Sequence, residues 1–90
     1  KQYENKIYEI YQIVKKTFGK KIGLPSVTKK RIKFIENLGL GAHSNWDSLG
    51  HIRFLFNVEK KYKIKINETN VHNFNNVKSI ANYLKNNHLI

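Results

Sequence analysis

The sequence predicts an all-α fold, in which three longer helices and one short helix form a small four-helix bundle with a long loop between the first and second helices. Three observations support this prediction. Apolar residues recur at spacings of three and four along three segments, as on the buried face of an amphipathic helix. Asp47 and Asn76, which are favourable helix-capping residues, precede two of those segments. The single proline and most glycines lie in the interval 19–46, as in a long loop. The 90 residues are expected to form one domain, residues 1–90.

The first helix is predicted from Tyr3 to Phe18. One apolar stripe follows it at helical spacing and consists of Ile7, Ile10, Tyr11, Val14 and Phe18. Lys6, Lys15 and Lys16 fall outside the stripe, so we expect them to face solvent. Gly19 supplies a stop signal at the C-terminal end of the helix.

The long loop covers residues 19–46 and contains Pro25. A short helical turn is predicted within it around Lys30–Leu38, where apolar residues again recur at helical spacing. We expect Trp46, at the end of the loop, to anchor it to the core. Loops of this length in compact domains are often functional.

The second long helix is predicted to begin at Asp47, because an aspartate carboxylate accepts hydrogen bonds from the free N–H groups of a first turn. The face expected to be buried consists of Leu49, Ile52, Leu55, Val58, Glu59 and Tyr62. Phe54 widens this stripe, whereas Phe56 lies off it.

Residues 61–66 alternate with a period of two, which taken alone indicates a strand. A single strand would have no partner here, so we interpret the segment as an extended connector that Ile64 and Ile66 anchor to the core. A short helix is expected over Asn67–Phe74. Asn76 then caps a last helix, and the buried face of that helix consists of Val77, Ile80, Ala81 and Leu84.

The chain is strongly basic, with a formal net charge of +11, but this charge is unevenly distributed. Residues 1–33 contain ten basic and two acidic residues, and residues 60–90 contain six basic residues and one acidic residue. Residues 34–59 contain one basic and three acidic residues. The region in which the second long helix begins is therefore slightly negative, between two basic flanks.

The composition excludes several classes of protein. Cysteine is absent, which excludes disulfides, thiolate catalysis, Cys-ligated zinc and iron–sulfur clusters. No apolar run approaches the roughly 20 residues that a membrane-spanning helix needs. A signal-peptide pattern is also absent, so we expect a cytoplasmic location.

The segment Trp46–Ile52, W-D-S-L-G-H-I, resembles the attachment motif of acyl carrier proteins. The resemblance extends without a gap to Leu84. Residues 62–66, Y-K-I-K-I, are similar to the F-x-I-x-I connector of that family, and residues 59–62, E-K-K-Y, to its E-x-x-F helix ending. Asn76-Val77 stands where the family commonly has T-V, and residues 34–39, F-I-E-N-L-G, resemble the stretch that packs the preceding loop.

The resemblance implies that Ser48 is the attachment site of a covalent cofactor, 4′-phosphopantetheine. The thiol of this arm would carry acyl or aminoacyl groups as thioesters between biosynthetic enzymes. The implied protein is a non-catalytic carrier, simplest as a monomer, and its implied partners are a phosphopantetheinyl transferase and acyl- or aminoacyl-loading and -accepting enzymes. A helix N-terminus suits this phosphodiester, because its negative charge meets free N–H groups and the positive end of the helix dipole.

The chain differs from the strongly acidic carriers of fatty-acid synthesis. The helix face that presents carboxylates in those proteins here holds Gly50, His51, Arg53, Asn57, Lys60 and Lys61. Trp46 before the D-S-L run and Gly-His after it are more similar to specialised carriers of secondary-metabolite or surface-glycan pathways. Beside the motif residue Asp47, we expect Leu49 and Phe56 to give apolar partner contacts, and Arg53 to face acidic partner groups together with Lys60 and Lys61.

The main alternative is a small basic nucleic-acid-binding helical domain. The net charge, the five tyrosines and the cluster Lys29-Lys30-Arg31 with Lys33 favour it, because lysines neutralise phosphates without sequence specificity. Only two arginines are present, and no known DNA- or RNA-binding motif occurs, so nucleic-acid binding is the less favoured interpretation.

An enzyme would need Ser48 as nucleophile, His51 as base and Asp47 to orient that base. Adjacent residues at a helix start point in divergent directions, so these three do not predict a catalytic triad. The four histidines form no i, i+4 pair, so no metal site is predicted. We expect each histidine to face solvent or to cap a helix.

Overall fold

A computed structural model describes residues 2–19 and 32–87 of the chain. The helices are α1 (Gln2–Phe18), α2 (Ile32–Glu36), α3 (Ser48–Tyr62), the 3₁₀ helix η3 (Val71–Phe74) and α4 (Val77–Asn86). In these two ranges the only β pairing is an isolated bridge between Gly39 and Asn76. The prediction of a small all-α bundle with three longer helices is confirmed.

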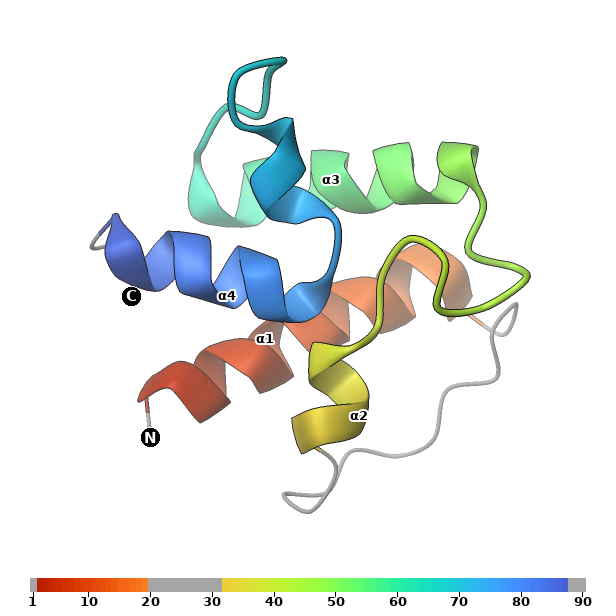
Figure 1. Cartoon of the computed structure of the whole chain (residues 1–90), viewed down its shortest axis with the longest axis horizontal. Coiled ribbons are helices and arrows are strands. Elements are labelled where there is room, and N and C mark those ends of the chain that lie inside the picture. Colours follow the sequence, from red (N-terminus) through yellow and green to blue (C-terminus); the bar gives the residue numbers. More distant parts are fainter. Residues whose placement is uncertain (1, 20–31, 88–90) are drawn as a thin grey trace.

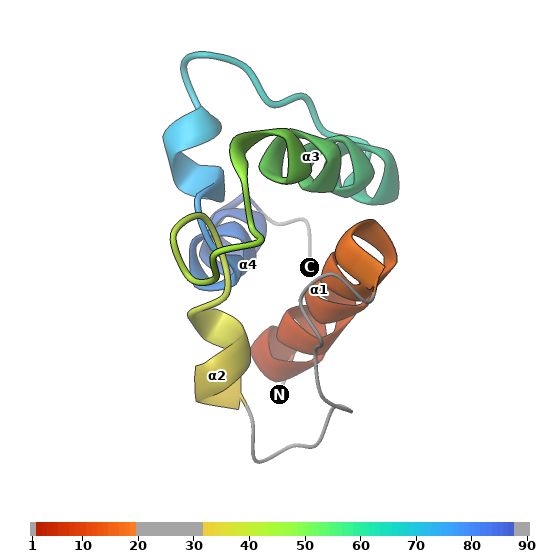
Figure 2. The same ribbon diagram turned by 90° about the vertical axis from the view of Figure 1, so that its right-hand side faces the viewer.

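Helix α1 is the central element of the packing, because it contacts α2, α3 and α4 (Figure 1). α3 runs in the opposite direction to α1, and α4 lies beside both α1 and η3. Seen from the side, α3 with its connector forms one end of the molecule, and α2 lies at the other end (Figure 2). The principal extents are 31 × 31 × 19 Å, so the bundle is a flattened body.

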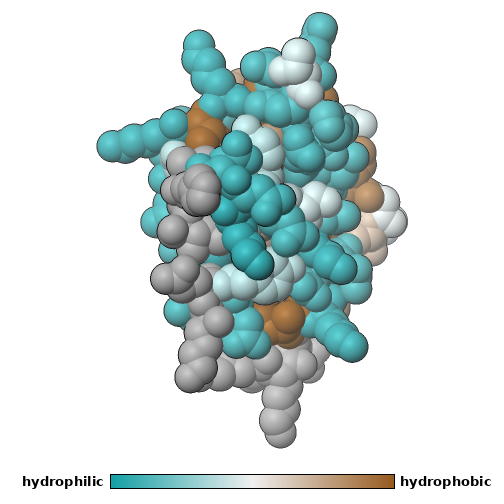
Figure 3. Space-filling model, turned by 60° about the vertical axis from the view of Figure 1, so that its left-hand side comes forward, coloured by the Kyte–Doolittle hydropathy of each residue, from teal (hydrophilic) through white to brown (hydrophobic). Residues whose placement is uncertain are grey.

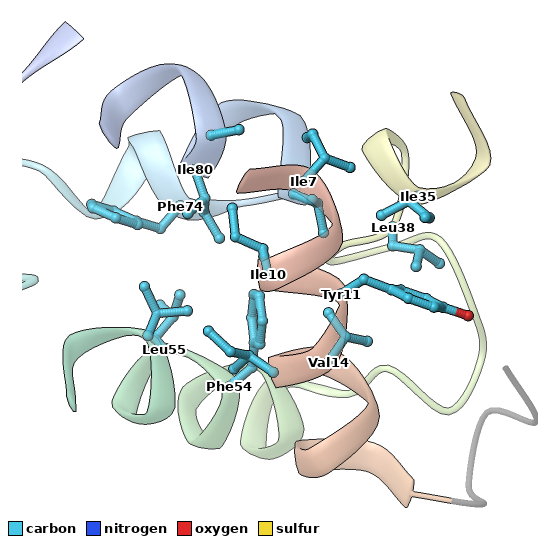
Figure 4. Close-up of a cluster of buried hydrophobic side chains, with 14 of the residues drawn as sticks. Ile7, Ile10, Tyr11, Val14, Ile35, Leu38, Phe54, Leu55, Phe74 and Ile80 are labelled. Carbon is cyan, nitrogen blue, oxygen red and sulfur yellow. The ribbon is translucent and has the colours of Figure 1, made fainter. Parts of the chain in front are cut away.

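The core is built on the predicted stripe of α1, all of which is buried. Ile10 lies between Ile80 of α4 and Phe54 of α3, and Tyr11 lies on the side of Ile35 and Leu38 (Figure 4). The stripe of α4 is also buried as predicted, with Val77, Ile80, Ala81 and Leu84 in the core. α1 is apolar over a wider arc than expected, because Ile13 is also buried.

The predicted helix boundaries are confirmed where local capping determines them. Asp47 Oδ1 accepts a hydrogen bond from Gly50 N at 2.7 Å, and Asn76 Oδ1 accepts one from Ser79 N at 2.7 Å. Gly19 follows α1 with a φ of 55°, which is a left-handed conformation that favours glycine.

Gly39 fastens the loop before α3 to the start of α4. A side chain at this position would overlap the backbone of residues 75 and 76, so only glycine permits the contact. Two hydrogen bonds flank it, from Leu40 N to Asn75 O and from Val77 N to Leu38 O, each 2.9 Å long. The loop that leads to Ser48 is therefore held at its middle.

The predicted buried face of α3 is wrong, because the helix is rotated about its axis relative to the prediction. Ile52 was expected in the core, but its side chain is 52% exposed, and Leu49, also assigned to that face, is 58% exposed. His51, expected to face solvent or to cap a helix, is buried. The observed core face of α3 consists of Gly50, His51, Phe54, Leu55 and Val58.

The connector expected over residues 61–66 begins only at Lys63, because Lys61 and Tyr62 still belong to α3. Ile64 and Ile66 pack against the core, as predicted, while remaining partly exposed. The anchor of the connector is Glu59, whose carboxylate accepts a hydrogen bond from Ile66 N at 2.7 Å. The short helix expected over Asn67–Phe74 is confined to the 3₁₀ turn η3, because Asn67 first closes a turn with Asn70.

The surface is mainly hydrophilic on the face in Figure 3, with separate hydrophobic patches. Lys16 is exposed as predicted, but Lys6 is largely covered, since its ammonium lies 4.9 Å from the centroid of the Tyr62 ring. Within the described parts of the chain, no helix has the length and apolarity needed to cross a bilayer. Pro25 and the cluster Lys29-Lys30-Arg31 lie outside the described residues.

Candidate functional site

Trp46 fixes the end of the loop immediately before the D-S-L run. Its side chain is 3% exposed, and its ring centroid lies 4.4 Å from that of Phe18 and 5.4 Å from that of Phe54. The indole Nε1–H donates a hydrogen bond to His51 Nδ1 at 3.0 Å. The expectation that Trp46 anchors the loop is confirmed, and its polar end finds a partner that the sequence analysis missed.

His51 is a buried neutral imidazole in this arrangement. Burial lowers its pKa below the usual 6.5, while the nearby backbone carbonyl of Phe74 opposes that shift without forming a hydrogen bond of ordinary geometry. Because Nδ1 accepts the indole hydrogen bond, the ring proton is assigned to Nε2. Protonation of Nδ1 would replace this acceptor with a second donor and break the contact with Trp46.

Asp47 and Ser48 form the exposed start of α3. Asp47 has extended backbone angles and caps the helix through both its carboxylate and its carbonyl, which accepts a hydrogen bond from His51 N at 2.9 Å. Ser48 is the first residue of the helix and is exposed. Its hydroxyl therefore lies in solvent, close to the positive end of the dipole of a 15-residue helix.

Gly50 brings the start of α3 close to the end of α1. A Cβ atom at Gly50 would lie 2.6 Å from Phe18 Cε1 and 2.9 Å from Asp47 Oδ1. The absence of a side chain thus lets the Phe18 ring pack against the helix and stack on Trp46. The turn that carries Ser48 therefore packs against the rings of Phe18 and Trp46.

A stripe of exposed apolar side chains follows Ser48 along α3, and we call it the apolar stripe: Leu49, Ile52 and Phe56. Their side chains are 58%, 52% and 59% exposed. It borders an open hollow of about 210 Å³ beside η3, whose lining consists of Ile52, Leu55, Phe56, Glu59, Ile66 and Val71. Contiguous exposed apolar side chains of this kind are typical of interaction sites.

The structure brings together most of the predicted site residues. Leu49 and Phe56 are exposed on the same side of α3, as a partner surface requires, and Arg53 is exposed on the next face of the helix. Ile52, which was expected only in the core, is a further exposed residue of this surface. The spacing of Leu49, Ile52 and Phe56 at i, i+3 and i+7 was the available signal for a second apolar face.

The three residues of the enzyme alternative do not converge. Asp47 Oδ1 is engaged by Gly50 N, and His51 Nδ1 is engaged by Trp46, while Ser48 faces solvent. Across residues 2–19 and 32–87, no group of three or more His, Cys, Asp or Glu side chains is placed to hold a metal ion.

No protein-family model matches the chain, and no match was found among curated proteins or among solved structures.

Proposed function

We propose that this chain is an acyl or aminoacyl carrier protein and that Ser48 is its attachment site for 4′-phosphopantetheine. The observation that carries the proposal is an exposed serine at the first position of a capped helix, followed directly by the apolar stripe. These are the two features that a carrier needs. The serine must be accessible to the modifying enzyme, and the adjoining surface must bind enzymes in succession.

The chemistry at Ser48 is a phosphoryl transfer from coenzyme A. The Ser48 oxygen forms a bond to the phosphorus that bears the pantetheine arm, the bond to the nucleotide bisphosphate breaks, and the serine proton passes to a base of the transferase. The protein itself supplies access and a favourable field, since the new phosphodiester lies at the start of α3. The arm then provides a thiol, a group that the cysteine-free chain lacks.

The apolar stripe supports the carrier function in a second way. Exposed Leu49, Ile52 and Phe56 offer contacts to the transferase and to loading and accepting enzymes, and the hollow beside Val71 offers an apolar surface within reach of a flexible arm. The contacts of Trp46 with His51 and Phe18 hold the first turn of α3 in place, so Ser48 keeps a constant position relative to the apolar stripe. Preorganised contacts of this kind lower the entropic cost of each association.

Intact mass spectrometry after incubation with coenzyme A and a broad-specificity phosphopantetheinyl transferase tests the proposal. The wild type and Ser44→Ala, which removes an exposed serine of the preceding loop, should each gain one arm, whereas Ser48→Ala should gain none. The proposal is wrong if the wild type stays unmodified while a known carrier is loaded in parallel. It is equally wrong if Ser48→Ala is loaded as well as the wild type.

A further inference from the structure

A second open site lies between α1 and α3 and adjoins the basic side of α3. We call it the α1–α3 cleft; its volume is about 330 Å³, and its lining residues are Glu9, Gln12, Ile13, Lys16, Asn57, Lys60 and Lys61. Arg53, Asn57 and Lys60 follow one another at helical spacing, so the same face continues toward Ser48. α3 therefore exposes two adjoining faces. One is the apolar stripe, and the other is a basic face that lines one side of the cleft.

The lysines of the cleft are available for a partner. Glu9 is the only carboxylate in the lining, and Lys6 pairs with it at 3.1 Å. Burial tends to raise the pKa of Glu9, but the neighbouring Tyr62 hydroxyl, the Lys6 ammonium and, to a smaller extent, the Lys61 ammonium lower it overall. Glu9 therefore stays ionised, and Lys6 is its ion-pair partner. Among the described residues, Lys16, Lys60 and Lys61 have no carboxylate within 4.0 Å.

The lining of the cleft includes one apolar residue, Ile13, most of whose side chain is packed in the core. Asn57 Nδ2 donates a hydrogen bond to Thr17 Oγ1 at 2.8 Å, which ties α3 to α1 beside the cleft. One apolar residue beside three lysines complements an apolar side chain that is flanked by carboxylates.

We propose that the α1–α3 cleft binds an acidic segment of a partner protein, with an apolar side chain over Ile13 and carboxylates facing Lys16, Lys60 and Lys61. A protein segment fits better than single-stranded nucleic acid, because no aromatic ring lines the cleft to stack on bases. The proposal goes beyond the carrier function and does not require modification of Ser48.

The test is a titration of the ¹⁵N-labelled full chain with a short helical peptide composed of leucine and glutamate. Chemical-shift changes should be centred on residues 9–16 and 57–61, and the affinity should fall as salt rises. Lys16→Glu with Lys60→Glu should weaken binding by about tenfold or more at low ionic strength. The charge-matched control, Lys78→Glu with Lys85→Glu on exposed positions of α4, should weaken it by less than about threefold, through long-range effects alone.

Other outcomes decide against the proposal. If the two double variants lose affinity equally, binding follows net charge and the cleft is not a site. If a single-stranded oligothymidylate of similar length perturbs the cleft residues more strongly than the peptide does, the ligand is nucleic acid. Ser48→Ala must bind the peptide like the wild type, so failure of the attachment experiment and failure of this one remain distinguishable.

Discussion

The two sides of α3 carry comparable apolar side chains, yet only one of them is buried. One side presents Phe54, Leu55 and Val58 to the core, where α3 packs on α1, whereas the other presents the apolar stripe to solvent. The buried side is not simply the more hydrophobic one, because it includes the polar His51 and the side-chain-free Gly50. Specific complementarity selects the core face: Gly50 admits the Phe18 ring, and His51 accepts the hydrogen bond of Trp46.

The exposed side of α3 has the character of a binding surface. When one face of a helix is packed in the core and a neighbouring apolar face stays exposed, the exposed face is typical of a binding surface. On α3 the stripe begins one residue after Ser48, so the proposed attachment site and the proposed partner surface share one rigid element. The Trp46–His51 contact on the opposite side holds this element in register with the loop.

Exchanging phenylalanine for alanine on each side of α3 is the strongest test of the comparison. Phe54→Ala should lower the free energy of unfolding by about 3–5 kcal/mol, because it leaves a cavity in the centre of the core. Phe56→Ala should change it by no more than about 0.5 kcal/mol, since its ring is mostly in solvent. Urea denaturation followed by circular dichroism measures both values. Equal losses would mean that the stripe is packed and that the assigned faces are rotated.

The same pair of variants separates stability from binding. Phe56→Ala should weaken the binding of partner enzymes, with a loss of binding free energy of about 1–3 kcal/mol, the range for an apolar anchor. Loading of Ser48 by a phosphopantetheinyl transferase should become slower for the same reason. The circular dichroism spectrum of this variant should match that of the wild type. Unchanged loading and binding would remove Phe56 from the partner surface.

Gly50→Ala tests whether the close approach of α1 selects the buried face. An alanine in a helix is favoured over glycine by about 1 kcal/mol, but the new Cβ would lie 2.6 Å from Phe18 Cε1 in a packed environment. Overpacking of this kind costs about 1–3 kcal/mol, so we expect a net loss of about 1 kcal/mol. Thermal and urea unfolding measure it.

A second substitution makes this prediction specific. In the Gly50→Ala background, Phe18→Leu should recover part of the lost stability, because the smaller side chain makes room for the new methyl group. The same Phe18→Leu change in the wild type should be destabilising, since Phe18 stacks on Trp46. Additive effects of the two changes would show that the contact does not control the packing of α3.

The features that the sequence predicts well are those determined by neighbouring residues. Asp47 and Asn76 cap helices through hydrogen bonds that span three residues, and the α1 stripe needs only helical periodicity. Ser48 is singled out by the resemblance of its D-S-L run to the carrier motif, and the local cap at Asp47 predicts only that it lies at a helix start. Its modification remains a prediction that the mass experiment must test.

The features that the sequence does not predict depend on contacts between distant segments. The predicted and the observed core faces of α3 share Leu55 and Val58, so periodicity alone does not decide between Ile52 and His51 as the core residue. The choice depends on Trp46 and Phe18, which meet α3 only after the loop and α1 have folded against it. The α1–α3 cleft likewise brings Lys16 of α1 beside Lys60 and Lys61 of α3. These residues are far apart in the sequence, so no local pattern predicts that they line one site.

The last and smallest expected effect is a pH dependence that originates at the buried side of α3. The folded protein keeps His51 neutral, and burial places its pKa below the usual 6.5, so the unfolded chain binds a proton more readily than the folded one. Stability from this group is fully present above about pH 6.5 and falls as the pH drops toward the folded-state pKa. The groups around the ring are Trp46, Phe54 and the Phe74 carbonyl, and no charged side chain among the described residues contributes to the shift.

The slope of that fall is at most about 1.4 kcal/mol per pH unit for one proton, so we expect a loss of no more than about 1 kcal/mol between pH 6.5 and 5.5. Emission from Trp46, the single tryptophan, should report unfolding and the loss of its contact with His51 over the same range. His51→Gln should flatten the dependence, whereas His72→Gln, at an exposed histidine, should leave it unchanged. If the His51→Gln protein retains the full pH dependence, or if NMR titration of the wild type gives His51 a pKa above 6.5, the buried neutral imidazole is not what links Trp46 to α3.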